Sequence, residues 1–301
     1  MLAVMGATGN TGRATCEALL ANGEMVTVVG RNLEKLADYA RAGAELAIAD
    51  ALDSAALTKA FEGATAVYVM IGVDPTVADY DAHYDAISEA TAFAILAAGV
   101  SHVVELSGIG SHLAPEVTKA MGAIDTGRRH EIRFNSVLTD VNVVHLRPGF
   151  FMENFLRDIP SIRERGKVYG PLTADKPIAM ISTHDIGQRA ADLLQNGNFS
   201  GTRAYDLLGP ADLTPREATQ ELGRAIGVDN LEYVETSVDA FRESMIGHGV
   251  SESCAAAVAG IYEGYNSGRL VPENPRNADS STPTTIAEFG VCFAHAYHAT
   301  G

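Results

Sequence analysis

The feature that most constrains the fold is a glycine-rich segment at residues 6–12. It reads Gly-Ala-Thr-Gly-Asn-Thr-Gly and stands between the apolar run Leu2–Met5 and a helical pattern. Gly6 permits a sharp turn out of a strand, Gly9 lets the main chain approach a pyrophosphate, and Gly12 lets the helix pack close to a sheet. The start of that helix offers free N–H groups and a positive dipole end to phosphate oxygens. We predict a dinucleotide site at Gly6, Thr8, Gly9, Asn10, Thr11 and Gly12; a purely structural turn is the alternative.

Apolar runs and helical patterns alternate through the first half of the chain. The short runs are rich in Val, Ile, Leu and Met, which is typical of strands buried on both faces of a parallel sheet. Amphipathic stretches separate them, and this alternation predicts an α/β fold with a Rossmann-type, doubly wound sheet. The predicted strands are Leu2–Met5, Met25–Val29, Leu46–Ile48, Ala66–Ile71, Val103–Leu106 and Val141–Leu146, and the predicted helices are Thr11–Ala21, Leu33–Ala42, Ser54–Phe61, Tyr80–Ala98 and Glu116–Val137.

The regular alternation ends after Pro148-Gly149. Residues 1–150 are therefore predicted to form the dinucleotide-binding domain, and residues 151–301 a smaller, mostly helical substrate lobe. The run Ile178–Ile181 and the helical pattern after it suggest that residues 178–208 return to the first domain, with Thr183 as a helix cap. The segment Pro272–Thr285 is rich in Pro, Asn, Ser and Thr and predicts an extended surface segment. The further predicted helices are Phe150–Arg163, Thr214–Ile226, Ser237–Met245 and Glu252–Tyr265.

The end of the second predicted strand carries an arginine, Arg31. A site specific for NAD usually places an acid here to hold the ribose 2′-hydroxyl, whereas an arginine suits the 2′-phosphate of NADP. The planar guanidinium offers donors that match phosphate geometry, and Arg13 and Lys35 could assist. A solvated surface arginine is the alternative. We expect NADP(H) to be preferred over NAD(H).

Other candidate cofactor residues follow later strands. Asp50 could bind the adenine amine or cap the next helix, and the sequence leaves both open. Ile71 and Gly72 close the fourth strand, where the chain passes beneath the cofactor. Pro148, Gly149 and Phe150 are expected to run beside the nicotinamide.

Several longer segments together resemble one family. Besides the glycine loop, they are Gly99–Val104, which leads to Leu106–Gly110, and Leu146–Asn154, which reads Leu-Arg-Pro-Gly-Phe-Phe-Met-Glu-Asn. Ile181–Gly187 and Leu208–Pro210 extend the similarity into the second half. The chain resembles the NmrA-like family of atypical short-chain dehydrogenases/reductases over nearly its whole length. The resemblance implies a Rossmann domain, NADP(H) binding and a cleft toward the C-terminal lobe, and it implies no single activity.

The chain departs from ordinary short-chain reductases in its acid–base residues. Those enzymes carry Tyr-x-x-x-Lys, with the tyrosine as proton donor, and this spacing occurs nowhere here. The usual catalytic assignment therefore cannot be transferred. Ser107, at the end of the fifth strand, could orient a substrate oxygen or contact the cofactor, and its alternative role is capping. His112 or Lys119 could stabilise an oxyanion, although each is more often a surface residue.

The sequence also suggests places for other residues of the following helix and for the wall of a substrate site. His130 and Glu131 are expected to be solvated residues on the following helix. The predicted apolar walls of a substrate site are Phe151, Met152, Phe155 and Tyr169.

The bulk properties exclude several classes of function. The formal charge is −16, from 22 basic and 38 acidic residues, which disfavours nucleic acid and anionic membranes as partners. The three cysteines are far apart and predict free thiols and no metal site. No run approaches the roughly 18–20 apolar residues of a membrane span, and the first residues already read as a strand. We expect a soluble, cytoplasmic protein.

Three functional hypotheses follow. The first is an NADPH-dependent reductase of a hydrophobic quinone- or carbonyl-bearing aromatic small molecule, such as a tailoring step on a natural product. The second is a non-catalytic NADP(H) sensor with a protein partner, which the missing tyrosine–lysine pair favours. An epimerase or dehydratase is the least favoured hypothesis, because such chemistry usually depends on the tyrosine–lysine pair that is missing here. A homodimer is compatible with the fold, but no residue pattern requires one.

Overall fold

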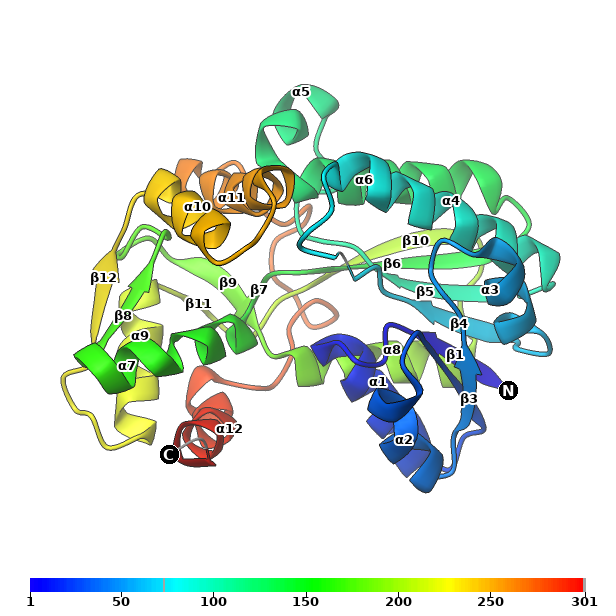
Figure 1. Ribbon diagram of the computed structural model, residues 1–301, viewed down its shortest axis with the longest axis horizontal. Coiled ribbons are helices and arrows are strands. Elements are labelled where there is room, and N and C mark those ends of the chain that lie inside the picture. The colour runs from blue at the N-terminus through cyan, green and yellow to red at the C-terminus, as the bar shows by residue number, and fades with distance from the viewer. Residues whose placement is uncertain (73, 300–301) are drawn as a thin grey trace.

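A parallel sheet forms the centre of the computed structural model, which describes residues 1–72 and 74–299. Within these residues seven strands pair in the order β10-β6-β5-β4-β1-β2-β3 (Figure 1). Every pairing in this sheet is parallel. The predicted α/β, Rossmann-type sheet is confirmed. Its strands are β1 (Leu2–Met5), β2 (Val26–Gly30), β3 (Glu45–Ile48), β4 (Ala66–Val69), β5 (His102–Leu106), β6 (Asn142–Pro148) and β10 (Thr202–Leu207).

Helices cover both faces of the sheet, as continuous apolar strands require. All four residues of β1 and of β4 are buried. One apolar cluster joins one face to Leu19, Leu36 and Ile186, and the other joins the opposite face to Leu57, Ile87 and Phe134. Figure 1 shows the same two layers. The first layer holds α1 (Asn10–Ala21), α2 (Leu33–Arg41) and α8 (Thr183–Asn196), and the second holds α3 (Ser54–Phe61), α4 (Tyr80–Ala97) and α6 (Ala123–Val137).

The helix predicted over Glu116–Val137 is broken. It is divided into α5 (Pro115–Thr118), the 3-10 helix η1 (Lys119–Met121) and α6. Gly122 stands at the break with φ +51°, and a Cβ there would lie 2.2 Å from the carbonyl oxygen of Ala257. The close approach of a later helix therefore requires glycine at this point and interrupts the periodic pattern.

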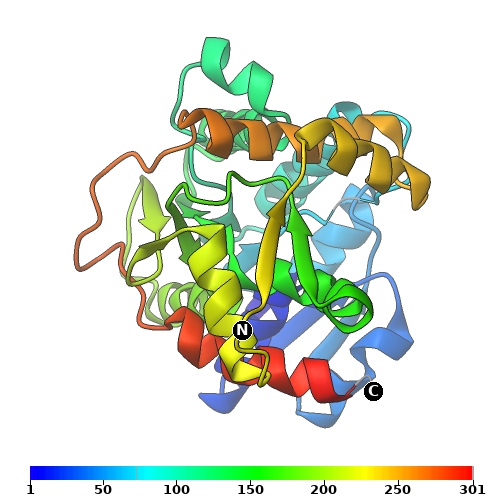
Figure 2. The ribbon, with the colours of Figure 1, turned by 90° about the vertical axis from the view of Figure 1, so that its left-hand side faces the viewer.

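Outside the main sheet, the chain after β6 forms two small sheets and, besides α8 and η2, five helices among the described residues. The sheets have the orders β11-β9-β7 and β12-β8, and Figure 2 shows β12 and β8 side by side. The predicted helix Phe150–Arg163 begins instead as a strand and a 3-10 helix. The elements are β7 (Phe150–Phe151), η2 (Met152–Asp158), α7 (Ile159–Arg165), β8 (Lys167–Gly170), β9 (Ile178–Ile181), β11 (Asp212–Leu213), α9 (Pro215–Ala225), β12 (Glu232–Glu235), α10 (Val238–Gly247), α11 (Glu252–Ser267) and α12 (Ile286–Ala299).

Residues 178–208 are shared between the two parts of the molecule. β9 pairs with β7 in a small sheet, whereas β10 pairs with β6 and α8 packs on α1. The return to the main sheet therefore starts at α8, and β9 does not join it. Ser182 caps this helix by accepting a hydrogen bond from the N–H of His184, so the prediction of Thr183 as the cap is wrong. The division at residue 150 stays a prediction, and residues 300–301 lie outside the described residues.

The segment between α11 and α12 runs over the surface without regular helix or strand (Figure 2). Near the end of this segment, Thr284 hydrogen-bonds the carboxylate of Asp185 through its N–H and hydroxyl. The helix α12 that follows was not predicted, although Ile286, Phe289 and Phe293 form a buried helical stripe.

None of the described helices has both the length and the hydropathy needed to cross a bilayer.

Candidate active site

The glycine loop forms a main-chain cradle at the carboxyl end of β1. Gly9 precedes α1, and no side chain caps this helix, so the N–H groups of its first turn remain free. Gly6 has φ +83°, a conformation that favours glycine. A Cβ at Gly12 would lie only 2.2 Å from the carbonyl oxygen of Gly6. Helix and loop can approach this closely only without that side chain, and the result is an anion-binding helix terminus.

A cavity of about 280 Å³ opens beside this loop, and we call it the glycine-loop cavity. Arg31 lies on its wall and forms no ion pair within the described residues. Arg13 and Lys35, which were expected to assist it, do not line the cavity. The predicted cofactor residues that do line it are Gly6, Thr8, Gly9, Arg31, Asp50 and Gly72.

Two carboxylates share the glycine-loop cavity with Arg31. Hydrogen bonds from Thr76, and to a smaller extent the charge of Arg31, lower the pKa of Asp74. Asp50 accepts the N–H of Leu52 at 2.9 Å. The cap of α3 is Asp53, so Asp50 does not have the capping role that the sequence left open. Asp50 therefore remains a candidate partner for the adenine amine.

A second cavity, the central cavity, measures about 490 Å³. Met70 lines both it and the glycine-loop cavity, so the two spaces are neighbours at the end of β4. The structure thus gathers residues that follow three different strands around one space. The predicted cofactor and substrate residues on its wall are Ile71, Ser107, Pro148, Gly149, Phe150 and Phe151.

Much of the central cavity is built from residues that the sequence reasoning missed. Val258, Ile261, Tyr262 and Tyr265 line it from α11, at the spacing of one helix face. This apolar and aromatic stripe could have indicated a covering helix, but an ordinary core produces the same pattern. From α4, Tyr80 and Tyr84 line the same cavity.

The other predicted wall residues have different places. Phe155 and Tyr169 line a third cavity of about 490 Å³, which we call the outer cavity. Met152 lines none of these three cavities in the described structure and is 1% exposed. Its side chain packs near Gly209, so its assignment as a substrate contact is wrong.

Two of the three predicted catalytic residues lie away from the central cavity. Lys119 is exposed on the 3-10 helix η1. His112 is half-buried and lies near Asp206, whose pKa it influences. Neither His112 nor Lys119 lines any of the three described cavities.

Ser107 is tied to a buried ion pair. Its hydroxyl donates a hydrogen bond of 2.5 Å to Glu131 on α6. Glu131 accepts two more from Arg147, the residue before Pro148, at 2.8 and 2.5 Å. Burial lowers the pKa of Arg147, but the hydrogen bonds and charges of Glu131 and Glu273 outweigh it and raise the value. The prediction that Glu131 is solvated is wrong, because the buried guanidinium needs this carboxylate.

A second buried cluster joins β5 to β6. Glu105 accepts a hydrogen bond from His145 at 2.5 Å and also contacts His130. Burial alone would raise the pKa of Glu105, but the charges and hydrogen bonds of the two histidines lower it to about 2. His130 lies 2.6 Å from the hydroxyl of Ser88 and is 1% exposed, so the prediction that it is solvated is wrong.

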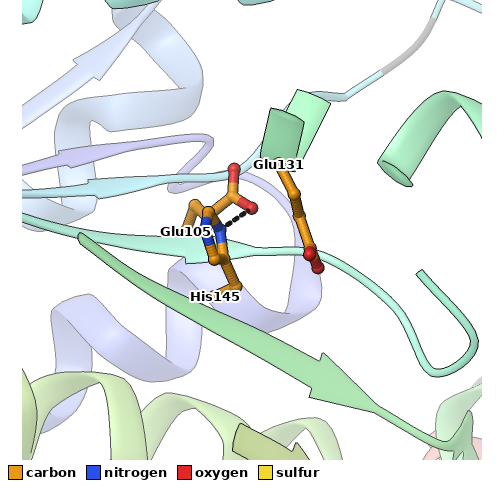
Figure 3. Close-up of side chains that lie close together, drawn as sticks. All are labelled: Glu105, Glu131 and His145. Carbon is orange, nitrogen blue, oxygen red and sulfur yellow. Dashed lines mark hydrogen bonds and ion pairs between the residues drawn. The ribbon is translucent and has the colours of Figure 1, made fainter. Parts of the chain in front are cut away.

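Figure 3 shows Glu131 beside the Glu105–His145 pair. Ligand atoms of these three residues lie within 4.8 Å of one another, as in many metal sites. Each carboxylate already faces a protein cation, since His145 bonds Glu105 and Arg147 bonds Glu131. The cluster therefore fits a structural charge network that holds β5 and β6 beneath the central cavity.

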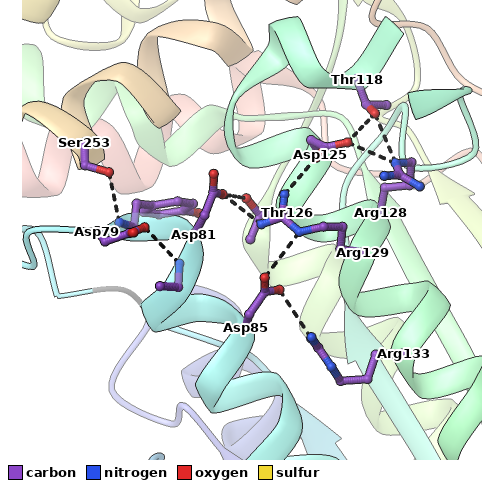
Figure 4. Close-up of polar contacts among 12 residues, drawn as sticks. Asp79, Asp81, Asp85, Thr118, Asp125, Thr126, Arg128, Arg129, Arg133 and Ser253 are labelled. Carbon is purple, nitrogen blue, oxygen red and sulfur yellow. Dashed lines mark hydrogen bonds and ion pairs between the residues drawn. The ribbon is translucent and has the colours of Figure 1, made fainter. Parts of the chain in front are cut away.

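A further network joins α4, α6 and α11 beside this cavity (Figure 4). Arg129 on α6 bonds Asp81 at 2.9 Å and Asp125 at 2.7 Å. The main-chain N–H of Tyr80 donates to the hydroxyl of Ser253 on α11 at 2.9 Å. Single half-exposed ion pairs contribute little, but this network fixes Tyr80 between two helices.

The profile of the NmrA-like family matches residues 1–289. The chain belongs to the NmrA-like family. Its sequence is 34% identical, over 82% of the chain and 80% of the relative, to the (4-alkanoyl-5-oxo-2,5-dihydrofuran-3-yl)methyl phosphate reductase of Streptomyces griseus. It is 27% identical to the NAD(P)H azoreductase of Xenophilus azovorans, over 99% of the chain and 100% of the relative.

Solved structures of two reductases share the fold. The NADPH-dependent quinone oxidoreductase 2 of Escherichia coli, solved with NADPH, aligns over 100% of both chains with a TM-score of 0.78 and 23% identity. The triphenylmethane reductase of a Citrobacter species, solved with NADP(H), covers 97% of this chain and 99% of its own, with a TM-score of 0.77 and 20% identity. The curated relatives named above place this NmrA-like chain among the oxidoreductases.

Proposed function

We propose that this NmrA-like protein uses NADPH to reduce a hydrophobic small molecule with a conjugated carbonyl group, such as a quinone. The observation that carries the proposal is the junction at Met70, which lines both the glycine-loop cavity and the aromatic central cavity. A dinucleotide that spans this junction would place its phosphates at α1 and its nicotinamide beside Pro148 and Phe150.

The residues of the glycine-loop cavity fit NADPH. The free N–H groups at the start of α1 suit the diphosphate, and the lack of a side chain at Gly12 keeps that turn close to the sheet. Arg31 has no carboxylate partner within hydrogen-bond distance in the described structure, so its guanidinium is available to a 2′-phosphate. These features support NADPH over NADH as the preferred coenzyme.

The hydrogen bond of Ser107 supports a cofactor role over a catalytic one. A serine hydroxyl has one proton, and of its two neighbours, the Glu131 carboxylate at 2.5 Å and the Ser111 hydroxyl at 3.1 Å, the charged carboxylate is the stronger acceptor. The oxygen of Ser107 can then accept a hydrogen bond from the central cavity but cannot donate one. It suits the N–H of a nicotinamide carboxamide better than a substrate oxygen that needs a proton.

The tyrosine hydroxyl groups that line the central cavity are poor acids. Burial raises the pKa of Tyr80, Tyr84, Tyr262 and Tyr265 above the ordinary tyrosine value. When bound, the reduced nicotinamide supplies a hydride. A quinone or other conjugated acceptor spreads the resulting negative charge and can take its proton from water, whereas a plain ketone needs a positioned acid. The site therefore fits conjugated acceptors best.

The activities of three relatives agree with this substrate class. They include a quinone oxidoreductase, an azoreductase and a reductase of an alkanoyl dihydrofuranone phosphate. All three names describe acceptors or substrates with extended conjugation.

A turnover assay tests the proposal. We would follow NADPH absorbance with menadione as the conjugated acceptor and acetophenone as the plain ketone, with protein-free samples as blanks. We expect kcat/KM for menadione to exceed that for acetophenone by at least about 100-fold, because only the ketone needs a protein acid. Equal rates with the two acceptors, or no oxidation of NADPH with menadione, would contradict the proposal.

A further inference from the structure

The outer cavity extends the central cavity away from the glycine loop. Both cavities are lined by Phe150, Asn154, Arg157 and Tyr262, so they meet at these residues. The rest of the outer wall is mainly apolar or aromatic and could accept a flexible alkyl chain. Its further residues include Phe155, Leu172, Phe241, Met245, His248 and Val250.

Arg157 is the arginine at this junction. Its guanidinium donates a hydrogen bond to the hydroxyl of Tyr262 and lies 5.6 Å from the ring centre of Phe241. Within the described residues no carboxylate forms an ion pair with it. Arg128, Arg147 and Arg216 each pair with an acid in this strongly acidic chain. The Arg157 side chain is held by aromatic rings and is exposed to solvent, and no carboxylate within the described residues occupies its donors at the cavity wall.

The acidic residue that follows Arg157 in the chain does little to cancel its charge. Asp158 also lines the outer cavity, but burial raises its pKa to about 7 even though Arg157 opposes the shift. A carboxyl group with this pKa is only partly ionised near neutral pH. His248 lines the same cavity, and its imidazole side chain carries no negative charge.

We propose that Arg157 binds an anionic group of the substrate, a phosphate monoester or a carboxylate, while an attached alkyl chain occupies the outer cavity. The guanidinium has five N–H donors, and the bond to Tyr262 uses one of them. The remaining donors can bind two oxygens of such a group side by side. The inference rests on the proposed function, which places the reducible part of the same molecule in the central cavity.

Calorimetry with hexyl phosphate tests the anion site without turnover. We expect hexyl phosphate to bind the unmodified protein, and Arg157→Met to weaken this binding at least about tenfold, whereas hexan-1-ol binding stays the same. Arg163→Met is the matched control, because Arg163 lies on the exposed side of α7 and lines neither cavity. No binding of hexyl phosphate to the unmodified protein, or equal binding by Arg157→Met, would overturn the inference.

A turnover arm separates this inference from the proposed function. The probes are a naphthoquinone with a carboxyalkyl side chain and its methyl ester, each reduced with NADPH. We expect Arg157→Met to lower the ratio of kcat/KM values, acid over ester, by about tenfold without changing NADPH affinity. An unchanged ratio would overturn the inference. If neither quinone is reduced by the unmodified protein, the proposed function fails, and the calorimetry still decides whether Arg157 binds anions.

Discussion

The glycine-loop cavity and the central cavity are built in different ways. The first uses main-chain groups of residues 6–12, with a few side chains at the ends of neighbouring strands. The second uses side chains from four distant segments, around residues 70–84, 106–127, 148–157 and 258–265. Only the packing of α11 over the sheet brings the last segment to the others.

This difference separates diphosphate binding, which main-chain groups perform, from acceptor binding, which depends on side chains. Main-chain N–H groups at a helix terminus bind a diphosphate whatever the neighbouring side chains are. A wall of side chains can change with each substitution on α11 while the coenzyme site stays intact. We therefore expect changes in the two regions to have separable effects on coenzyme and acceptor.

The largest expected effect is at Gly12. In Gly12→Ala the new Cβ would lie 2.2 Å from a main-chain oxygen, so the loop itself must move. We expect NADPH affinity to fall by at least about 100-fold, or about 2.7 kcal/mol. The measurement is NADPH fluorescence, which is simple in a chain without tryptophan. Gly247→Ala is the control, since nothing lies within 4 Å of a Cβ there. Normal binding by folded Gly12→Ala would disprove the cradle.

Val258→Trp tests the other region. Val258 lines the central cavity, so a large ring there should fill acceptor space. We expect kcat/KM for menadione to fall about 30-fold, with NADPH affinity unchanged within about twofold. Ala256→Trp, on the exposed side of the same helix, serves as the control and should keep both values. A parallel loss of NADPH affinity in Val258→Trp would show that the two regions are not separable.

Arg31→Ala asks whether one side chain adds selectivity to the main-chain site. Loss of the guanidinium should weaken NADPH binding about tenfold and leave NADH binding nearly unchanged, because only NADPH has the 2′-phosphate. Isothermal titration with both coenzymes gives the comparison. Lys35→Ala is the control, because Lys35 does not line the cavity and should not affect either affinity. Equal weakening of both coenzymes would contradict the assignment of Arg31.

The smallest expected effect concerns the buried Glu105–His145 pair, which joins β5 to β6 in the central sheet. Burial alone would lower the pKa of His145, but the charge of Glu105 and its hydrogen bond to His145 raise the value above 6.5. The imidazolium form therefore stabilises the fold fully below pH 6.5, and this contribution is lost as pH rises through the raised pKa. The pKa of Glu105 is lowered from 4.5 to about 2, so the stabilising contribution of its charge is fully present above pH 4.5 and is lost as the pH falls toward 2.

We accordingly expect His145→Gln to lower the free energy of unfolding most between pH 4.5 and 6.5. The difference from the unmodified protein should shrink at alkaline pH, as judged by urea titrations. Asn196→Gln, at an exposed helix end, should show no such trend. A difference that grows with pH would mean that His145 is neutral in the folded protein.

The elements that were predicted well are those with local causes. The strand Leu2–Met5 and the helix Ser54–Phe61 have the predicted bounds, since apolar runs and caps lie within a few residues of each. The helix over Glu116–Val137 was not predicted correctly, because its break at Gly122 depends on contact with Ala257. The predictions for His130 and Glu131 were wrong for a similar reason, because their partners lie far away in the sequence, on β5 and β6.

The sequence by itself determined the parallel sheet and the glycine cradle at its first strand. Both follow from hydrophobic periodicity and from the conformational freedom of glycine, which act over a few residues. Only the tertiary structure decided which side chains face an acceptor. Tyr262, Arg157 and Ser107 acquire their surroundings from segments about 24 to 105 residues away, and burial and charge depend on those neighbours in space.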